Sequence, residues 1–223
     1  MAPASVRTVG KDKMNDSNPI VSKKPDEVLQ GVHIFRDYLA VSEQETVVAA
    51  LRDIAHKAPT YSTITGFGKP MSVKMTSAGS YGWFSDRKGY RYIDTHPSGA
   101  PWPNIPKEIL QIWHALVPDS PDPECCLINF YGEKARMGLH QDRDEANFEW
   151  PVLSISLGDD ALFRIGGTDR KDPTKSTWLK SGDVCLMGGD ARLAFHGIDR
   201  TKFGTSTLLP KGGRLNLTLR VVN

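Results

Sequence analysis

The C-terminal half of the chain contains a succession of short strand-like runs, which constrains the fold more than any other feature. From Cys125 onward, apolar runs rich in Val, Ile, Leu and Phe are separated by turns of Gly, Asp and Pro. The runs are CCLINFY, PVLSISL, ALFRI, STWLK, DVCLMGG, RLAFHG and RLNLTLRVV. Many short strands in sequence predict an antiparallel sandwich or barrel rather than a parallel sheet.

Two helices are predicted upstream of these strands. Ser42 and Glu45 form an S-x-x-E capping pattern that predicts a helix over residues 42–57. Apolar residues at helical spacing predict a second helix over 106–116. Between the helices, glycine, serine, threonine and aromatic residues over 65–102 predict hairpins and loops. We therefore expect an α+β fold that is mainly β, with helices on one side of the sheets.

Composition excludes several classes of protein. No apolar run reaches the roughly 18 residues of a membrane span, and the first residues lack the apolar core of a signal peptide. Cys125, Cys126 and Cys185 form no CxxC pair, which favours a reducing, cytoplasmic setting. The formal charge of +2 permits a nucleic-acid partner without requiring one. Phosphate-binding motifs such as GxGxxG and GxxxxGK[ST] are missing from the sequence.

His140-Gln141-Asp142 is the sharpest chemical signal. Residues two apart on a strand face the same side, so an imidazole and a carboxylate could reach one ion. His196, on another predicted strand, would complete a two-histidine, one-carboxylate set that leaves positions open on Fe(II) for a co-substrate and dioxygen. An H-x-D triplet also occurs by chance, and a zinc hydrolase could use the same ligands. The three residues alone therefore leave the chemistry open.

The last predicted strand has polar residues on one face and leucines on the other. Its polar residues are Arg214, Asn216, Thr218 and Arg220. If this face lines a closed interior, the two arginines require anions, and a dicarboxylate supplies two. Asn129 and Tyr131 lie two apart on an earlier predicted strand and would add further donors. An exposed edge strand with solvated charges would show the same alternation, so both interpretations remain.

Taken in order, these motifs resemble the AlkB family of iron- and 2-oxoglutarate-dependent nucleic-acid demethylases. The resemblance runs from about Met71 to the C-terminus and rests on NFY, LHQDRDE, SISLG, FRIGG, GDVCLMGGDARLAFHGI and RLNLTLR. It implies a double-stranded β-helix, or jelly-roll, core with flanking helices and an N-terminal nucleotide-recognition lid. By this resemblance the Fe(II) ligands are His140, Asp142 and His196. The residues implied to bind 2-oxoglutarate are Asn129, Tyr131, Arg214, Asn216 and Arg220.

The same resemblance assigns substrate contacts to the lid segment SVKMTSAGSYGWFSDRKGYRY. Trp83 would stack on the extruded base, with His140 on its other side, and Met75 would line the pocket. The implied contacts to backbone phosphates are Tyr90, Arg91 and Tyr92. Asp144 would help to read the damaged base, and Arg170 matches a substrate-contact position. From the residues alone, hairpin packing is the preferred explanation for Trp83 and the tyrosines, and Asp144 and Arg170 are ordinary surface charges.

The resemblance implies oxidative demethylation of 1-methyladenine and 3-methylcytosine, with Fe(II), 2-oxoglutarate and O2 required and formaldehyde, succinate and CO2 released. The methyl group lies on the pairing edge, so the substrate would be single-stranded or locally opened alkylated DNA, with RNA as a second candidate. Two alternatives remain. One is a 2-oxoglutarate oxygenase acting on RNA, a protein or a small molecule, and the other is a non-catalytic single-strand binding module.

The expected organisation is one catalytic domain preceded by a tail. Residues 1–25 are polar and lack apolar periodicity, which predicts a disordered tail. Residues 26–124 would supply the helices and the lid, residues 125–223 the jelly-roll core, and 26–223 together a single domain. We expect a cytoplasmic monomer with no membrane partner.

Overall fold

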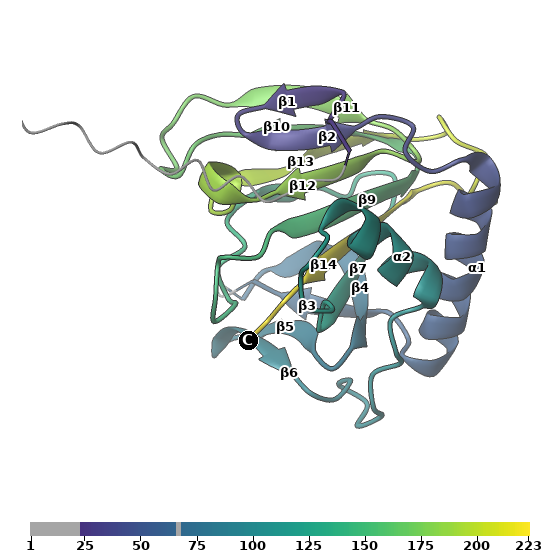
Figure 1. Ribbon diagram of the computed structural model, residues 1–223. Coiled ribbons are helices and arrows are strands. Elements are labelled where there is room, and N and C mark those ends of the chain that lie inside the picture. Colours follow the sequence, from purple (N-terminus) through teal and green to yellow (C-terminus); the bar gives the residue numbers. More distant parts are fainter. Residues whose placement is uncertain (1–22, 66–67) are drawn as a thin grey trace, which may run out of the picture.

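The computed structural model describes residues 23–65 and 68–223, and it contains two antiparallel sheets, a separate hairpin and two α-helices (Figure 1). The larger sheet contains β1 (Glu27–Leu29), β2 (Val32–Phe35), β3 (Tyr61–Ile64), β4 (Pro70–Gly79), β7 (Cys125–Tyr131), β9 (Val152–Gly158), β12 (Val184–Met187) and β14 (Arg214–Arg220). The smaller sheet contains β8 (Met137–His140), β10 (Asp160–Ile165), β11 (Lys175–Leu179) and β13 (His196–Lys202). The hairpin consists of β5 (Gly82–Asp86) and β6 (Gly89–Ile93), and the helices are α1 (Val41–Lys57), α2 (Lys107–Leu116) and a 3-10 turn η1 (Gly189–Ala191).

The strand order confirms the expected jelly roll. The eight strands of the large sheet run β1-β2-β12-β9-β14-β7-β4-β3, and the four of the small sheet run β11-β10-β13-β8. Neighbours in space are thus mostly distant in sequence, as in the double-sheet jelly rolls that combine two Greek keys. Buried apolar side chains of both sheets, including Ile34, Phe163 and Ile165, form one cluster that holds the sheets together.

Both helices lie on one side of the large sheet, as the sequence predicts (Figure 1). Apolar residues at helical spacing, such as Leu51 on α1 and Trp113 on α2, pack in one cluster with Leu217 of β14. The predicted N-terminus of the first helix was wrong. Its N-cap is Ala40, whose backbone N–H donates to the Glu43 carboxylate at 2.7 Å. Within the described residues, no helix has the length and apolar content that a bilayer crossing requires.

β14 occupies the middle of the large sheet, paired with β7 on one side and β9 on the other. Because successive side chains of a strand point to opposite faces, the leucines of β14 face the helices and its polar residues face the space between the sheets. Arg214 is 1% exposed and Arg220 is 5% exposed. This finding rules out the edge-strand interpretation, in which both charges would be solvated.

Two expectations about strand ends were wrong. The run RLAFHG was predicted as a strand, but β13 begins only at His196, because η1 and the turn after it redirect the chain. His140 and Asp142 were expected on one strand, but β8 ends at His140, where its ladder with β13 also ends at the His140–His196 pair. Asp142 therefore follows the strand. Of the predicted tail over 1–25, residues 1–22 lie outside the described residues.

β8 and β13 approach each other closely at Gly197. A Cβ atom at this position would lie 2.6 Å from the Met137 carbonyl oxygen and 2.8 Å from the Gly138 carbonyl oxygen. Both obstacles are backbone atoms and cannot rotate away. The glycine thus allows the pairing that brings His196 opposite His140.

We predict that Gly197→Ala lowers the free energy of unfolding of the metal-free protein by about 1–3 kcal/mol, because the added methyl group forces β8 away from β13. Urea unfolding measures this change. Gly138→Ala is the matched control, because a Cβ atom at Gly138, on the neighbouring strand, meets no atom within 4 Å. Equal stability of the two variants would contradict the prediction.

Candidate active site

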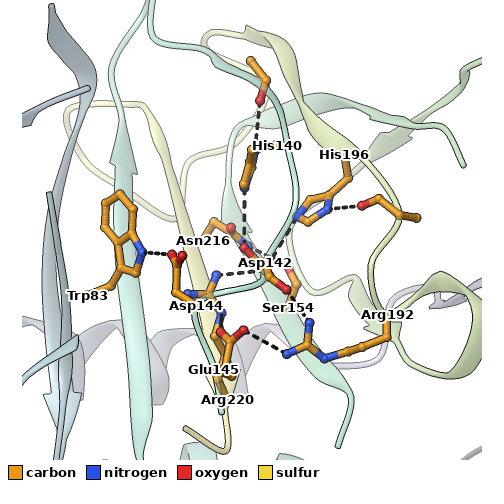
Figure 2. Close-up of polar contacts among 12 residues, drawn as sticks. Trp83, His140, Asp142, Asp144, Glu145, Ser154, Arg192, His196, Asn216 and Arg220 are labelled. Atoms are coloured by element: carbon orange, nitrogen blue, oxygen red, sulfur yellow. Dashed lines mark hydrogen bonds and ion pairs between the residues drawn. The ribbon is translucent and has the colours of Figure 1, made fainter. Parts of the chain in front are cut away.

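Three potential metal ligands meet in the space between the two sheets (Figure 2). His140 ends β8, His196 begins β13, and Asp142 lies on the loop after β8. One ligand atom from each residue lies within 4.8 Å of the other two. The Asp142 carboxylate oxygens are each 3.7 Å from the Nε2 atom of one imidazole. The structure therefore brings together the set predicted from the sequence, and its atoms are close enough to share one ion.

The backbone fixes how the two imidazoles present their nitrogens. The Nδ1 atom of His140 lies 2.9 Å from the Gly138 carbonyl oxygen, and that of His196 lies 3.0 Å from the Ala194 carbonyl oxygen. A carbonyl oxygen only accepts, so each Nδ1 carries the proton. Each Nε2 atom then keeps its lone pair and faces Asp142, which is the orientation that a metal ligand requires.

The protonation of the two buried residues, His196 and Asp142, is also suited to binding a cation. Burial, followed by the charge of the neighbouring His140, lowers the pKa of His196 to about 4, so this imidazole is neutral at pH 7. Burial alone would raise the pKa of Asp142, but Arg220 and the two imidazoles outweigh it and hold this pKa well below its usual range. At pH 7, Asp142 therefore presents a carboxylate and His196 a neutral imidazole to a metal ion.

Glu145 and Arg192 are two charged residues close to Asp142 that the sequence analysis missed. Glu145 is buried and accepts hydrogen bonds from Tyr92 at 2.6 Å and from Arg192 at 3.1 Å. Arg220 forms ion pairs with Asp142 at 2.9 Å and with Glu145 at 3.5 Å. Both missed residues lie within motifs already singled out, LHQDRDE and GDVCLMGGDARLAFHGI, but nothing in those motifs distinguishes a buried charge from a solvated one.

The neighbouring part of the cavity suits an anion. The Arg214 guanidinium donates a hydrogen bond to Ser156 at 3.0 Å, and its Nε and Nη1 atoms have no hydrogen-bond partner among the described residues. Its carbon lies 5.1 Å from the centre of the Tyr131 ring. Burial lowers the pKa of Arg214, so the isolated cation is held at a cost. A carboxylate placed here would pair with the free donors.

The remaining predicted co-substrate residues surround the same cavity. Asn129, Tyr131, Asn216 and Arg220 line it together with Arg214. Asn216 donates to Ser154 at 2.7 Å, which orients its side chain, and the Asn129 amide oxygen has no hydrogen-bond partner among the described residues. The ligand set, the unpaired buried cation and this polar wall together fit an iron ion with a keto-diacid beside it.

The β5–β6 hairpin supplies the aromatic side of the cavity. Trp83 and Tyr90 are stacked, with ring centres 5.3 Å apart, and both line the cavity, as does the buried Met75. The Trp83 indole N–H donates to Asp144 at 2.8 Å (Figure 2). Asp144 lies on the loop after β8, which ends at His140.

The other predicted substrate contacts are engaged within the protein. Arg91 forms a two-pronged ion pair with Asp86 at 2.7 and 2.9 Å, and the Tyr92 hydroxyl bonds to Glu145. Neither belongs to the cavity lining. Arg170 does line the cavity, and both of its terminal nitrogens donate to the Leu139 carbonyl, at 2.8 and 3.1 Å. Hairpin packing thus accounts for part of the aromatic and basic pattern.

Comparison with known proteins agrees with this geometry. Residues 31–220 match the family model described as the 2OG-Fe(II) oxygenase superfamily. A protein of Caulobacter vibrioides named "Alpha-ketoglutarate-dependent dioxygenase AlkB homolog" is 54% identical over 198 residues, which are 88% of this chain and 90% of that protein. The chain belongs to the AlkB family of 2OG-Fe(II) oxygenases. It is therefore a dioxygenase that uses Fe(II), 2-oxoglutarate and O2.

Two further AlkB-family proteins extend the comparison. An Arabidopsis thaliana relative named "DNA N(6)-methyladenine demethylase ALKBH1C" is 31% identical over 85% of this chain and 48% of its own length. The solved structure of OsALKBH1 matches with a TM-score of 0.75 at 29% identity, covering 87% of this chain and 98% of that one. Membership of the AlkB family favours the oxygenase interpretation over a zinc hydrolase and over a non-catalytic binding module.

We predict that Arg214→Met makes the ligand-free protein more stable by about 1–3 kcal/mol, because it removes a buried cation that lacks an anion. The same change removes the stabilisation that 2-oxoglutarate gives the wild type, which is about 2.7 kcal/mol at a concentration 100 times the Kd. Urea unfolding with and without the co-substrate measures both effects.

Arg200→Met is the control for this prediction, because the Arg200 side chain is 65% exposed. That variant should keep the wild-type response to 2-oxoglutarate. An Arg214→Met protein that loses stability in the ligand-free state yet still responds fully to the co-substrate would contradict the prediction.

Proposed function

We propose that this dioxygenase demethylates N-methylated bases in nucleic acid, with 1-methyladenine and 3-methylcytosine in DNA as its main substrates and RNA as a second substrate. One observation carries the proposal. A single cavity of about 580 Å³ is lined by the His140–Asp142–His196 set, by the buried arginines of β14, and by Trp83 and Tyr90 of the hairpin. An oxidising centre and an aromatic surface suited to a planar base thus share one space.

In this proposal the core residues hold the reagents. His140, Asp142 and His196 bind Fe(II), and Arg214 and Arg220 bind the two carboxylates of 2-oxoglutarate, with Asn129, Tyr131 and Asn216 as additional polar contacts. When bound, iron with 2-oxoglutarate and O2 supplies the oxidising power that inserts one oxygen atom into a C–H bond. The protein contributes by fixing positions, by orienting the imidazoles through Gly138 and Ala194, and by keeping water away.

The overall reaction converts the N-methyl group to N-hydroxymethyl, while 2-oxoglutarate and O2 become succinate and CO2. The N-hydroxymethyl group then loses its hydroxyl proton to solvent, the C–N bond breaks with its electron pair staying on the nitrogen, and formaldehyde leaves. No bond of the nucleic-acid backbone is cut. Because the methyl group is on the pairing edge, the base must leave the stack first, and a methylated base is cheaper to extrude because it pairs poorly.

Charge supports an N-methylated base as the preferred target. 1-Methyladenine and 3-methylcytosine are cationic, and Asp144 places a carboxylate in the cavity wall next to Trp83. A carboxylate attracts the cationic base more than the neutral, unmodified one. In the proposed complex the base lies between Trp83 and His140, and Met75 packs against its edge. The Trp83–Asp144 hydrogen bond fixes the indole in place for this contact.

The phosphate contacts are proposed for the outer face of the hairpin. Tyr90 is 51% exposed and is available to a strand that enters the cavity. Arg170 borders the cavity, but it would have to share its donors with the Leu139 carbonyl. Arg91 carries its charge at the same edge but would have to share it with Asp86. Tyr92 would have to release Glu145 to reach a phosphate, and we propose that it acts mainly by supporting the hairpin from beneath.

We further propose that residues 26–223 act as one catalytic domain and that the protein works as a cytoplasmic monomer. The single domain is supported by the sheet, in which β4 from the lid region 26–124 pairs with β7 from the core region 125–223. A cytoplasmic setting is supported by the free, buried cysteines at 125, 126 and 185.

We predict that the wild-type protein releases formaldehyde and succinate in equal amounts from 2-oxoglutarate and a single-stranded oligonucleotide with one 1-methyladenine. His196→Ala should lose this activity by more than about 100-fold, because loss of groups that only support metal ligands already costs about 10–100-fold. His114→Ala is the control, since His114 is an exposed histidine at the end of α2. Formaldehyde and succinate are measured in the same reaction.

The same assay separates the alternatives. Single-stranded DNA should react faster than a duplex, because no pairing must be broken. Equal activity in wild type and His196→Ala would refute the proposed site. If the protein forms succinate but releases no formaldehyde from any methylated DNA or RNA, it is a dioxygenase whose substrate is a protein or a small molecule.

A further inference from the structure

The loop that carries Asp142 has no regular structure of its own. Between the end of β8 at His140 and the start of β9 at Val152, the chain forms bends without helix or strand hydrogen bonds. His140 and His196, in contrast, are held by paired strands. A metal centre requires all of its ligands to be fixed within a fraction of an ångström. Side-chain contacts must therefore hold the carboxylate of Asp142 relative to the two imidazoles.

Arg220 pairs with the Asp142 carboxylate itself at 2.9 Å, and Arg192 holds the backbone of the loop. The Arg192 side chain is 4% exposed, and its three donor groups reach three separate points of the loop. Nη1 donates to the Asp142 carbonyl oxygen at 2.6 Å, Nε donates to the Trp150 carbonyl oxygen at 2.9 Å, and Nη2 donates to the Glu145 carboxylate at 3.1 Å. Figure 2 shows the Arg192 guanidinium facing Glu145 on the side of Asp142 away from Trp83. One planar group thus ties the start, the middle and the end of the loop together.

Because Arg192 is close to His196 in the chain, its hydrogen bonds also link the segment that carries His196 to the loop that carries Asp142. Arg192 lies four residues before His196, on the turn between η1 and β13. The next residue, Leu193, accepts a hydrogen bond from the Gln141 side chain at 2.6 Å. The segment that carries one metal ligand is therefore bonded directly to the segment that carries another, at residues close to both.

Glu145 balances the charge of this contact. Both Glu145 and Arg192 are buried, and a buried guanidinium without an anion would destabilise the fold. Glu145 also accepts from Tyr92 and pairs with Arg220, so the loop is held from the side of the hairpin as well. A lysine at position 192 would keep the charge but lacks the planar fork that reaches three acceptors in different directions.

We propose that Arg192 is a positioning residue of the metal centre, which sets the place of the Asp142 carboxylate relative to His196 without touching the ion. The inference rests on the proposed metal site and extends it to a residue outside the ligand set. Removing the guanidinium leaves the three ligands in the chain but frees the loop between them. The affinity for the metal then falls even though every ligand is present.

Binding of Co(II) alone tests this proposal, because its visible absorption reports the number and arrangement of ligands and needs neither co-substrate nor turnover. We expect Arg192→Lys to weaken Co(II) binding by about 10–100-fold and to change the absorption spectrum of the bound ion. Arg164→Lys is the matched control, because Arg164 on β10 contacts Thr174 and Asp199, away from the metal ligands. That control should bind Co(II) with the affinity and spectrum of the wild type.

Chemical rescue separates positioning from a general loss of stability. Arg192→Ala should regain Co(II) affinity when millimolar guanidinium is added, because the ion fits the space left by the side chain, and ammonium at the same concentration should have no effect. If neither Arg192 variant folds, Glu145→Gln keeps the shape of the acceptor and removes only its charge. We then expect several-fold weaker Co(II) binding and a changed spectrum.

Two results would overturn the inference. One is a folded Arg192→Lys protein with the Co(II) affinity and spectrum of the wild type. The other, if only the Glu145→Gln variant folds, is unchanged Co(II) binding in that variant. Failure of the underlying site gives a different result, because His196→Ala would then bind Co(II) as tightly as the wild type does.

Discussion

Charges held inside a β-sandwich are the constraint on which the rest of this structure depends. β14 lies between β7 and β9, so its alternation of leucine and polar residues sends the leucines to the helices and the arginines to the space between the sheets. Burying a cation is tolerated only where an anion or several acceptors meet it. Arg220 meets Asp142 and Glu145, whereas Arg214 meets a serine hydroxyl and an aromatic ring. The fold thus preserves a place for a carboxylate beside Arg214 that the described part of the chain does not itself supply.

The two buried acidic residues near the proposed iron site, Asp142 and Glu145, have different roles. Asp142 faces two imidazoles whose protons are fixed on Nδ1 by backbone carbonyls, so the carboxylate and both Nε2 atoms point to one place. Glu145, three residues later, accepts hydrogen bonds from Arg192 and Tyr92. One carboxylate is thus available to the metal, and the other holds the loop and the hairpin to the core.

The sequence was sufficient for features governed by periodicity. The alternation in β14 and β7 and the helical spacing in α1 and α2 could be predicted, because each depends on a repeating pattern of apolar residues. The jelly-roll arrangement of the strands was implied only by the resemblance to the AlkB family. The three candidate metal ligands were identified from residue type and order, and the structure brings them together. The end of β8 could not be predicted, since it depends on where the ladder with β13 stops. Arg192 and Glu145 were missed because their roles depend on which charges the fold buries together. The Trp83–Asp144 bond was missed because it depends on how the β5–β6 hairpin meets the loop after β8.

We propose that Fe(II) and 2-oxoglutarate bind in adjoining parts of one cavity, with the ion on His140, Asp142 and His196 and the co-substrate on Arg214. A crystal structure of the protein soaked anaerobically with Mn(II) and 2-oxoglutarate tests it most directly. We expect one ion bound by Nε2 of His140, Nε2 of His196 and the Asp142 carboxylate, with a co-substrate carboxylate bonded to the free nitrogens of Arg214. Density for the ion elsewhere, or a co-substrate that leaves Arg214 unpaired, would contradict it.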